Sequence, residues 1–358
     1  MCIVFFTSSR RYSLVLASNR DEFLARPTTR ASWHCWTPSL DSHTTSPTTR
    51  NRVLSGLDLA AGGTWLGLAF APAASRVGNA GGERVLRIAT LTNFTETILP
   101  VSPPRPSRGN LVKDFLDFKN GESLEEYLTG LEPVKDRYAG FNLLTIELRL
   151  PSSPASSTDR EPLVVGYCSN RETDTKKARV LPSFAAGSPV KGLSNATLEA
   201  EPGEEVWPKV KSGCEAVQSA IRDVESDGKG EEDLTSMLWD VLSTPSLSKI
   251  GHRSHLRNTV LVRPLSISPG SPLPEIPPPL PPPSLSPDPA DLSESVVQGK
   301  KEGEEGTRWY GTRTQTIILI ERETGRVVVK EREGYRLHDG KPAWVGATEA
   351  EHVFDFEV

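Results

Sequence analysis

Four short apolar runs limit the folds available to this chain. Residues 2–6, 14–17, 143–146 and 316–320 are apolar at nearly every position rather than at alternate positions. Strands of this kind are buried on both faces, so their sheets need a covering layer on each side. Helical patterns separate the groups of strands. We therefore expect an α+β fold, a four-layer αββα sandwich of two stacked sheets covered by helices; a three-layer α/β sheet is the alternative.

Two helical patterns are specific enough to place. The pair Ser123 and Glu126 has the spacing of a capping box, which predicts a helix start at that point. A second, longer helix is predicted from apolar residues at offsets of 0, 4, 8, 11 and 15, which share one face: Val206, Val210, Cys214, Val217 and Ile221.

Polar and proline-rich stretches interrupt what we expect to be a single domain over residues 1–358. The chain is 36% hydrophobic and contains 30 prolines. We expect a polar loop at 26–52, a Ser/Pro loop at 151–162 and a Pro-rich disordered insertion at 263–307, because these stretches lack apolar surface to bury. The PxxP spacing within 276–283 would suit an SH3-type partner, and a plain insertion is the alternative.

Charge and cysteine usage exclude several classes of protein. The formal net charge of −5 and the absence of a basic stripe argue against nucleic-acid binding. The apolar runs are too short for a transmembrane segment. Four widely spaced cysteines, with no CxxC pair and no secretion signal, favour an intracellular soluble protein without a disulfide framework.

The N-terminus carries the strongest candidate for chemistry. Cys2 follows the initiator Met, which is normally removed before a small residue. The exposed α-amine would titrate near pH 8 and could serve the thiol as a general base. Runs 2–6 and 13–17 predict a β-hairpin whose turn, if centred near residues 9 and 10, places Cys2 opposite Ala17 or Ser18.

The hairpin register decides which polar residues reach Cys2. The first register brings Asn19 and Asp21 to the face of Cys2, and the second brings Arg20 and Glu22. Either register puts an amide or charged group beside the thiol. The alternative is an ordinary solvated hairpin end with Cys2 as a small buried residue.

The order of motifs along the chain resembles the transport and Golgi organisation protein 2 family, which is named for its NRDE motif. The resemblance covers nearly the whole chain outside the three insertions. The motifs that carry it are Cys2, Asn19–Glu22, Gly62–Gly67, Leu91–Phe94, Ser107–Gly109, Gly140–Leu143, Leu193–Asn195 and Tyr310–Thr316.

This family is similar to the N-terminal-nucleophile hydrolases, whose fold is the αββα sandwich. The resemblance implies a nucleophile, an Arg/Asp pair, and Asn residues for the oxyanion and amine: Cys2, Arg20, Asp21, Asn93 and Asn195. Arg20 and Asp21 are adjacent here, whereas the hydrolases separate the pair by two residues. Neighbouring strand residues point to opposite faces, which leaves a hydrolase mechanism open.

The resemblance also implies a link to Golgi organisation, protein secretion, haem movement and acyl-CoA or lipid homeostasis. We expect a cytoplasmic protein, associated with the Golgi or mitochondria, that handles haem or an acyl-CoA and requires no cofactor; haem would be a transported ligand. Candidate ligand-binding residues are Asn19, Glu22, Trp65, Arg108 and Arg313. The alternatives are an N-terminal cysteine hydrolase of a small amide or thioester, and a secretory-pathway interaction protein.

Overall fold

The computed structural model places most of the chain. It describes residues 2–36, 53–70, 84–94, 105–118, 122–150, 163–172, 177–182, 184–200, 205–246, 250, 253–267, 308–345 and 351–357. The insertion at 151–162, the Pro-rich run at 276–283 and residues 37–52 lie outside these ranges.

Two seven-stranded antiparallel sheets form the body of the molecule. The first sheet has the order β10-β1-β2-β12-β13-β16, with β11 also paired to β12. Its strands are β1 (Ile3–Thr7), β2 (Tyr12–Phe23), β10 (Lys191–Leu193), β11 (Leu265–Ile267), β12 (Arg308–Glu321), β13 (Arg326–Glu333) and β16 (Glu351–Glu357). The sheet therefore joins the two ends of the chain.

The second sheet follows the order of its strands along the chain, as a meander. Its strands are β3 (Ser32–His34), β4 (Val53–Ser55), β5 (Leu66–Phe70), β6 (Arg84–Asn93), β7 (Phe141–Leu150), β8 (Leu163–Ser169) and β9 (Arg179–Val180). A separate hairpin consists of β14 (Tyr335–His338) and β15 (Lys341–Trp344).

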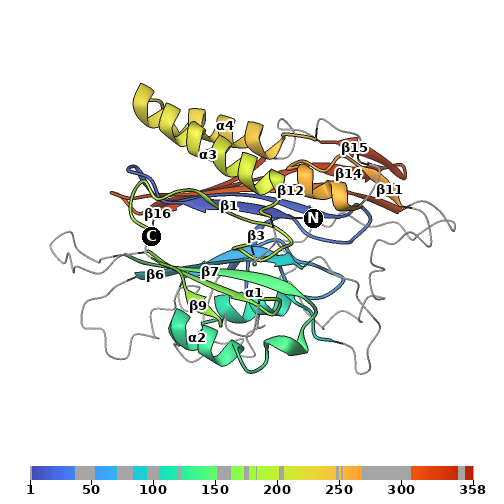
Figure 1. Cartoon of the computed structure of the whole chain (residues 1–358), viewed down its shortest axis with the longest axis horizontal. Helices are drawn as coiled ribbons and strands as arrows, with labels where there is room; N and C mark the ends of the chain where they lie inside the picture. Colours follow the sequence, from blue (N-terminus) through green and yellow to red (C-terminus); the bar gives the residue numbers. More distant parts are fainter. Residues whose placement is uncertain are drawn as a thin grey trace, which may run out of the picture.

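Helices cover the outer face of each sheet (Figure 1). The helices α3 (Pro208–Asp227) and α4 (Glu231–Leu242) pack on the first sheet, and α1 (Gly109–Leu116) and α2 (Leu124–Leu131) pack on the second. Short 3₁₀ turns occur at η4 (Lys135–Arg137) and η5 (Arg253–Asn258). The capping box predicted at Ser123 is confirmed at the start of α2.

Three apolar cores hold these layers together. The central core lies between the sheets, where Leu16 and Ile318 of the first sheet cluster with Leu68 and Ile146 of the second. A second core joins the first sheet to α3 and α4, and a third joins the second sheet to α1 and α2. Both faces of each sheet are thus removed from water, which accounts for the continuously apolar strands.

The hairpin register differs from both predicted registers. Ile3 pairs with Asn19, so Cys2, one residue before β1, lies across from Arg20 when the register is continued. Both predictions were wrong because pairing stops at Thr7 and Val15, so the connection between the paired residues is centred on Arg11 and not on residues 9 and 10. The face shared with Arg20 and Glu22 is the one that the Ser18 register predicted.

The buried face of α3 is also rotated from its prediction. Val206 lies before the helix and is 52% exposed, and Cys214 is only partly buried. Val217 and Ile221 are buried as predicted, and Val210 and Cys214 pack against the same core; the further buried residues of the helix are Lys209, Gly213, Ala220 and Val224. Gly213 causes this rotation, because a Cβ there would lie 2.1 Å from Cζ of Phe5 on β1. The helix α3 therefore comes close to β1 at Gly213.

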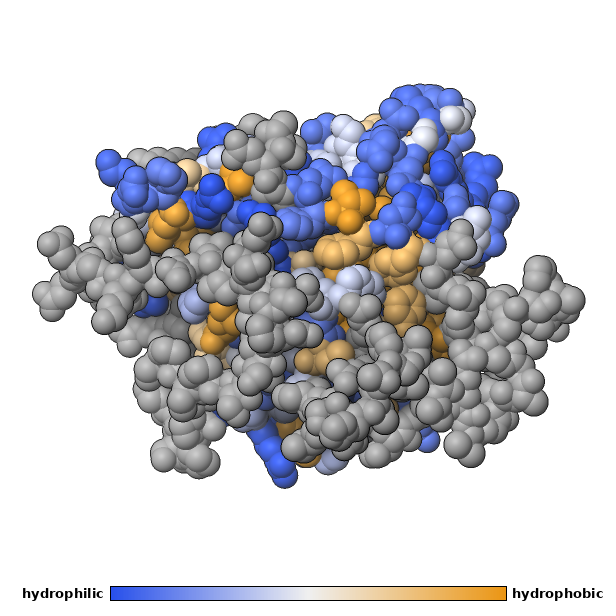
Figure 2. Space-filling model, turned by 180° about the vertical axis from the view of Figure 1, so that it is seen from behind, coloured by the Kyte–Doolittle hydropathy of each residue, from blue (hydrophilic) through white to orange (hydrophobic). Residues whose placement is uncertain are grey.

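Two of the expected loops contain strands. β3 lies within the polar stretch 26–52, and β11 lies near the start of the Pro-rich stretch 263–307. In the described part of the chain, no helix is both long and apolar enough to cross a membrane. Figure 2 shows hydrophilic residues over the layer at the top of the view, with apolar residues gathered at the level of the sheets.

Substitution of Gly213 tests the close contact between α3 and β1. Gly213→Ala should lower the free energy of unfolding by about 1–3 kcal/mol, because the added methyl overlaps the Phe5 ring. Gly130→Ala in α2 is the matched control, since nothing lies within 4 Å of a Cβ there, and it should stabilise slightly. Urea denaturation measures both; equal effects would contradict the packing described here.

Candidate functional site

Cys2 lies half-buried at the edge of the first sheet, just before β1 begins. Its Sγ is 3.8 Å from the main-chain oxygen of Asp21, which also accepts a hydrogen bond from the Tyr310 hydroxyl at 3.2 Å. Ser194, following β10, donates its hydroxyl to the main-chain oxygen of Cys2 at 2.7 Å. Residues at or next to the ends of β1, β2, β10 and β12 thus meet around Cys2.

Arg20 lies on the inner face of the first sheet, which faces the second sheet. Its guanidinium stacks 4.0 Å from the ring centre of Trp65, and its Nη2 lies 3.8 Å from a carboxylate oxygen of Glu22. The side chain is only 7% exposed, yet its Nη1 has no hydrogen-bond partner among the described residues. Trp65 and Glu22 thus hold a cation that retains one unsatisfied donor.

Asp21 points to the opposite, outer face of the same sheet. Its Oδ1 accepts a hydrogen bond of 2.6 Å from the hydroxyl of Thr312, and the outer face is covered by α3. Lys209 in the first turn of α3 is only 1% exposed and lies near enough for the charges of Asp21 and Cys2 to act on it. The adjacent Arg20 and Asp21 therefore serve two different sides of the sheet.

Arg313 is carried by a bulge in β12. Thr312 pairs with Asp21 and Thr314 pairs with Arg20, so Arg313 is the extra residue between them. The side chain is buried and donates from Nη1 to the main-chain oxygen of Arg26. Burial, followed by the positive charge of Arg20, lowers its pKa to about 10. Two arginines thus converge on the inner face.

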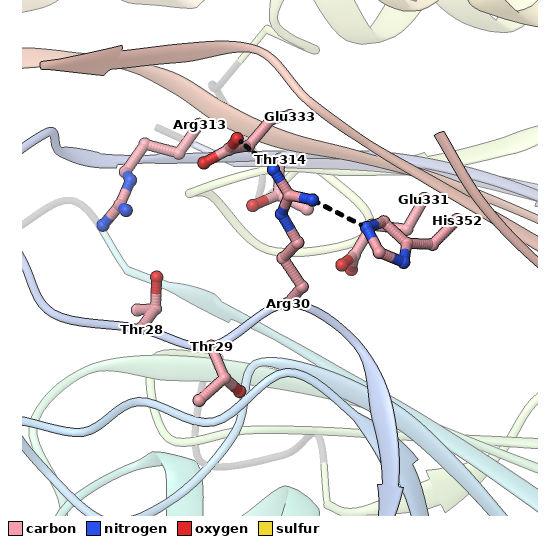
Figure 3. Close-up of a pocket in the computed structure, with 8 residues that line it drawn as sticks. All are labelled: Thr28, Thr29, Arg30, Arg313, Thr314, Glu331, Glu333 and His352. Carbon is pink, nitrogen blue, oxygen red and sulfur yellow. Dashed lines mark hydrogen bonds and ion pairs between the residues drawn. The ribbon is translucent and has the colours of Figure 1, made fainter. Parts of the chain in front are cut away.

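A polar pocket opens beside this arginine pair (Figure 3). Thr28, Thr29 and Arg30 follow β2 on one wall, and the other walls come from β12, β13 and β16. Arg30 bonds to Glu333 at 3.0 Å and to Nε2 of His352 at 2.9 Å. The lining residues are Thr28, Thr29, Arg30, Arg313, Thr314, Glu331, Glu333 and His352.

Strand register connects the thiol to this pocket. Arg20 is paired with Thr314, and Thr314 with Glu333, so these three lie in one row that continues the position of Cys2. Neighbouring strands lie about 4.8 Å apart, which puts Thr314 roughly 10 Å and Glu333 roughly 14 Å from Cys2. An elongated ligand would reach both ends of this row.

The two asparagines expected to stabilise an oxyanion meet near the thiol. Asn195 is buried and donates its amide to the main-chain oxygen of Asn93, whose own side chain is exposed. Asn195 follows Ser194, which binds Cys2 directly. Asn142 donates to the main-chain oxygens of Ser194 and Ala196 and so fixes this segment.

The remaining expected residues bind other parts of the fold. Asn19 donates to the main-chain oxygens of Leu242 and Val260 and accepts from Gln315, so it ties β2 to the end of α4. Arg108 donates to the main-chain oxygen of Gly140, at the start of β7. The structure thus gives Asn19 and Arg108 anchoring contacts.

Burial governs the titration of the key groups. It raises the pKa of the Cys2 thiol, which the charge of Asp21 raises further and that of Arg20 lowers. Burial also lowers the pKa of Lys209 to about 8, against the opposing effects of Asp21 and Cys2. At neutral pH the site therefore contains a largely protonated thiol beside an amine whose proton is easily lost.

Sequence reasoning missed Lys209, Glu331 and His352. Lys209 could have been found by shifting the predicted face of α3 by one position, which places a lysine on an apolar stripe with Gly213 and Val217. Glu331 and His352 carry no local signal, because strands distant in the sequence bring them together.

Comparison with known proteins supplies the family context. A family model described as Transport and Golgi organisation 2 matches residues 1–336. The mouse Transport and Golgi organization 2 homolog is 27% identical over 93% of this chain and 92% of its own length. The bovine homolog is 29% identical with the same coverage, and the human homolog is 29% identical over 68% of this chain and 72% of its own.

Glu331 makes stability depend on pH. Burial raises the pKa of its carboxyl group from 4.5 to about 7, although Arg20 and Arg30 oppose this shift. The folded state then binds the extra proton between pH 4.5 and 7, so this group lowers stability as pH rises through that window, by up to roughly 3 kcal/mol. Glu331→Gln should remove this loss. Urea titrations at pH 5 and 7.5 measure it, and an unchanged difference from wild type at both pH values would contradict it.

Proposed function

The chain belongs to the Transport and Golgi organisation 2 family, and on that premise we propose that it handles a small ligand with an anionic group. The observation that carries this proposal is the buried Arg20, whose Nη1 has no hydrogen-bond partner among the described residues. An unsatisfied buried cation is costly, and a carboxylate or phosphate would satisfy it. Burial and repulsion by the nearby charge of Arg20 lower the pKa of Arg313. This second arginine would share the anion.

An acyl-CoA suits this arrangement better than haem. Arg20 lies about 5 Å across from Cys2 and Arg313 lies beside Thr314, about 10 Å away, so this row would match a ligand with a carbonyl at Cys2 and an anionic group at the two arginines. Haem would also present carboxylates to the arginines, and it needs an axial ligand, commonly His, Cys or Met. His352 in the pocket bonds to Arg30, which favours a structural role for its ring.

The second candidate is an N-terminal cysteine hydrolase acting on a small amide or thioester. Arg20 lies across from Cys2, the main-chain oxygen of Asp21 lies 3.8 Å from Sγ, and the residue before Asn195 bonds to the main chain of Cys2; these contacts favour it. After removal of Met1, the α-amine would accept the thiol proton and Sγ would attack the carbonyl. The layer order of the fold agrees with the sandwich of N-terminal-nucleophile hydrolases, and we propose that relationship as part of this candidate.

We also propose a cellular setting, in which the chain acts in Golgi organisation and secretion from the cytoplasm, at the Golgi or mitochondria. The support for this proposal is that the relatives are named for transport and Golgi organisation. A protein partner for the Pro-rich stretch belongs to the same proposal, although its PxxP run at 276–283 lies outside the described residues.

Anion binding can be tested by calorimetric titration with hexanoyl-CoA, free CoA, hexanoate and haem. Arg20→Met and Arg313→Met should each weaken binding about ten- to hundredfold, because each removes charge-assisted hydrogen bonds. Binding should also weaken as pH rises through 7, since ionised Glu331 adds negative charge beside the arginines.

The matched control is Arg10→Met, which removes an arginine whose side chain is 83% exposed in the β1–β2 turn. It should bind as wild type does. Equal affinities for wild type and Arg20→Met would rule out this anion site, and a saturable Soret shift with haem alone would replace acyl-CoA by haem as the ligand.

Hydrolase chemistry can be tested with a fluorescent acylating probe. Protein lacking Met1, confirmed by intact mass, is used in a Cys35→Ala background, because Cys35 is exposed and would label independently. Labelling should map to Cys2 and disappear in Cys2→Ala. Label retained by Cys2→Ala would exclude this candidate.

A further inference from the structure

Trp65 covers the guanidinium of Arg20 from the opposite sheet. Arg20 lies in β2 of the first sheet, and Trp65 directly precedes β5 of the second. The Cζ atom of Arg20 lies 4.0 Å from the centre of the Trp65 ring, a close cation–π contact. Leu91 in β6 donates its main-chain N–H to the main-chain oxygen of Trp65 at 2.8 Å. The residue is thus tied to the second sheet while its ring stacks on a cation of the first.

Three glycines fix the position of this ring. A Cβ at Gly56 would lie 2.6 Å from Cη2 of Trp65 and 2.9 Å from the main-chain oxygen of Thr29. A Cβ at Gly63 would lie 2.6 Å from the carbonyl carbon of Gly109, so these two glycines meet backbone to backbone. Such close approaches need residues without side chains. Two of the motifs that carry the family resemblance, the one before β5 and the one before α1, therefore meet beside Trp65.

A second buried arginine shows what is different about Arg20. Arg332, on the outer face of the same sheet, lies 4.2 Å from the ring centre of Trp239. Its Nε donates to Gln315 and its Nη2 to Ser243, both at 2.7 Å. Arg20 has the same aromatic cover, yet its Nη1 has no hydrogen-bond partner among the described residues. A stacked ring covers the face of a guanidinium and leaves the donors in its plane open.

We propose that Trp65 is a positioning residue for the anion site: it holds the Arg20 guanidinium in one plane and shields it from water, so that the ligand approaches Nη1 edge-on. This inference rests on the proposed function of Arg20. A fixed and poorly hydrated donor binds an anion more tightly, because less side-chain ordering and less displacement of water oppose binding. Edge-on approach suits a carboxylate or phosphate that accepts two parallel hydrogen bonds. Trp65 thus acts on the ligand through Arg20.

Calorimetric titration with hexanoyl-CoA tests the effect on binding. Trp65→Leu should weaken affinity about tenfold, because Arg20 becomes mobile and hydrated. Trp65→Phe should weaken it about threefold at most, since it keeps an aromatic face. Trp239→Leu is the matched control, which uncovers Arg332 and should bind as wild type does. Equal affinities for wild type and Trp65→Leu, or equal losses in Trp65→Leu and Trp239→Leu, would overturn the proposal.

Gly56→Ala displaces the ring without changing any side chain of the site, and it serves where Trp65→Leu does not fold. It should weaken hexanoyl-CoA binding about tenfold, because the added methyl overlaps the edge of the indole. The double variant Gly56→Ala/Trp65→Phe should bind as Trp65→Phe does, since the smaller ring leaves room for the methyl. A loss that persists in the double variant would come from the main chain at Thr29 and would contradict the proposal.

A ligand-free measurement separates this inference from the proposed function. NMR of protein with isotope-labelled arginine reports the Nε–H of Arg20, identified by its absence in Arg20→Met. The ring face should shift this signal upfield and slow its exchange with water; both effects should vanish in Trp65→Leu and persist in Trp65→Phe. An Arg20 signal that is unchanged in Trp65→Leu would overturn the proposal even if the anion binds. If the signal changes as expected and wild type binds no anion, the positioning of Arg20 stands and the proposed function fails.

Discussion

Burial of the first sheet on both faces is the constraint on which the rest of the structure depends. Apolar strands satisfy it over most of the sheet, but one end carries charged and amide side chains that water does not reach. These groups must find partners inside the protein. On the inner face, Trp65 stacks on Arg20 and Glu22 pairs with its charge. On the outer face, Thr312 donates a hydrogen bond to Asp21. The candidate site is thus the polar end of an otherwise apolar sandwich.

Local patterns in the sequence predicted most elements but few distances. The Ser123 capping box and the strands around Leu16, Ile146 and Ile318 depend on neighbouring residues, and the structure contains them. The hairpin register depends on where the pairing stops, at Thr7 and Val15, which composition does not reveal. The likeness to N-terminal-nucleophile hydrolases stays a prediction, because it concerns relationships beyond this chain.

In the candidate site, too, local sequence patterns identified some residues and missed others. The NRDE motif located the thiol and its neighbours, because these residues lie in one hairpin. Lys209 escaped notice because the close approach of Gly213 to Phe5 determines which face of α3 is buried. Glu331 and His352 meet Arg30 only through the pairing of β13 with β16 and the path of the chain after β2. Such contacts are properties of the tertiary fold and leave no trace in sequence spacing.

The bulge at Arg313 makes the two sides of the site inseparable. Thr312 faces outward beside Asp21, yet Thr314, two residues later, pairs with Arg20 on the inner face. The extra residue has reversed the strand's alternation between them. Deletion or insertion of one residue here would exchange the side chains on the inner and outer faces of the sheet at the same time. The surroundings of Asp21 on the outer face and the arginine pocket on the inner face therefore depend on the same inserted residue.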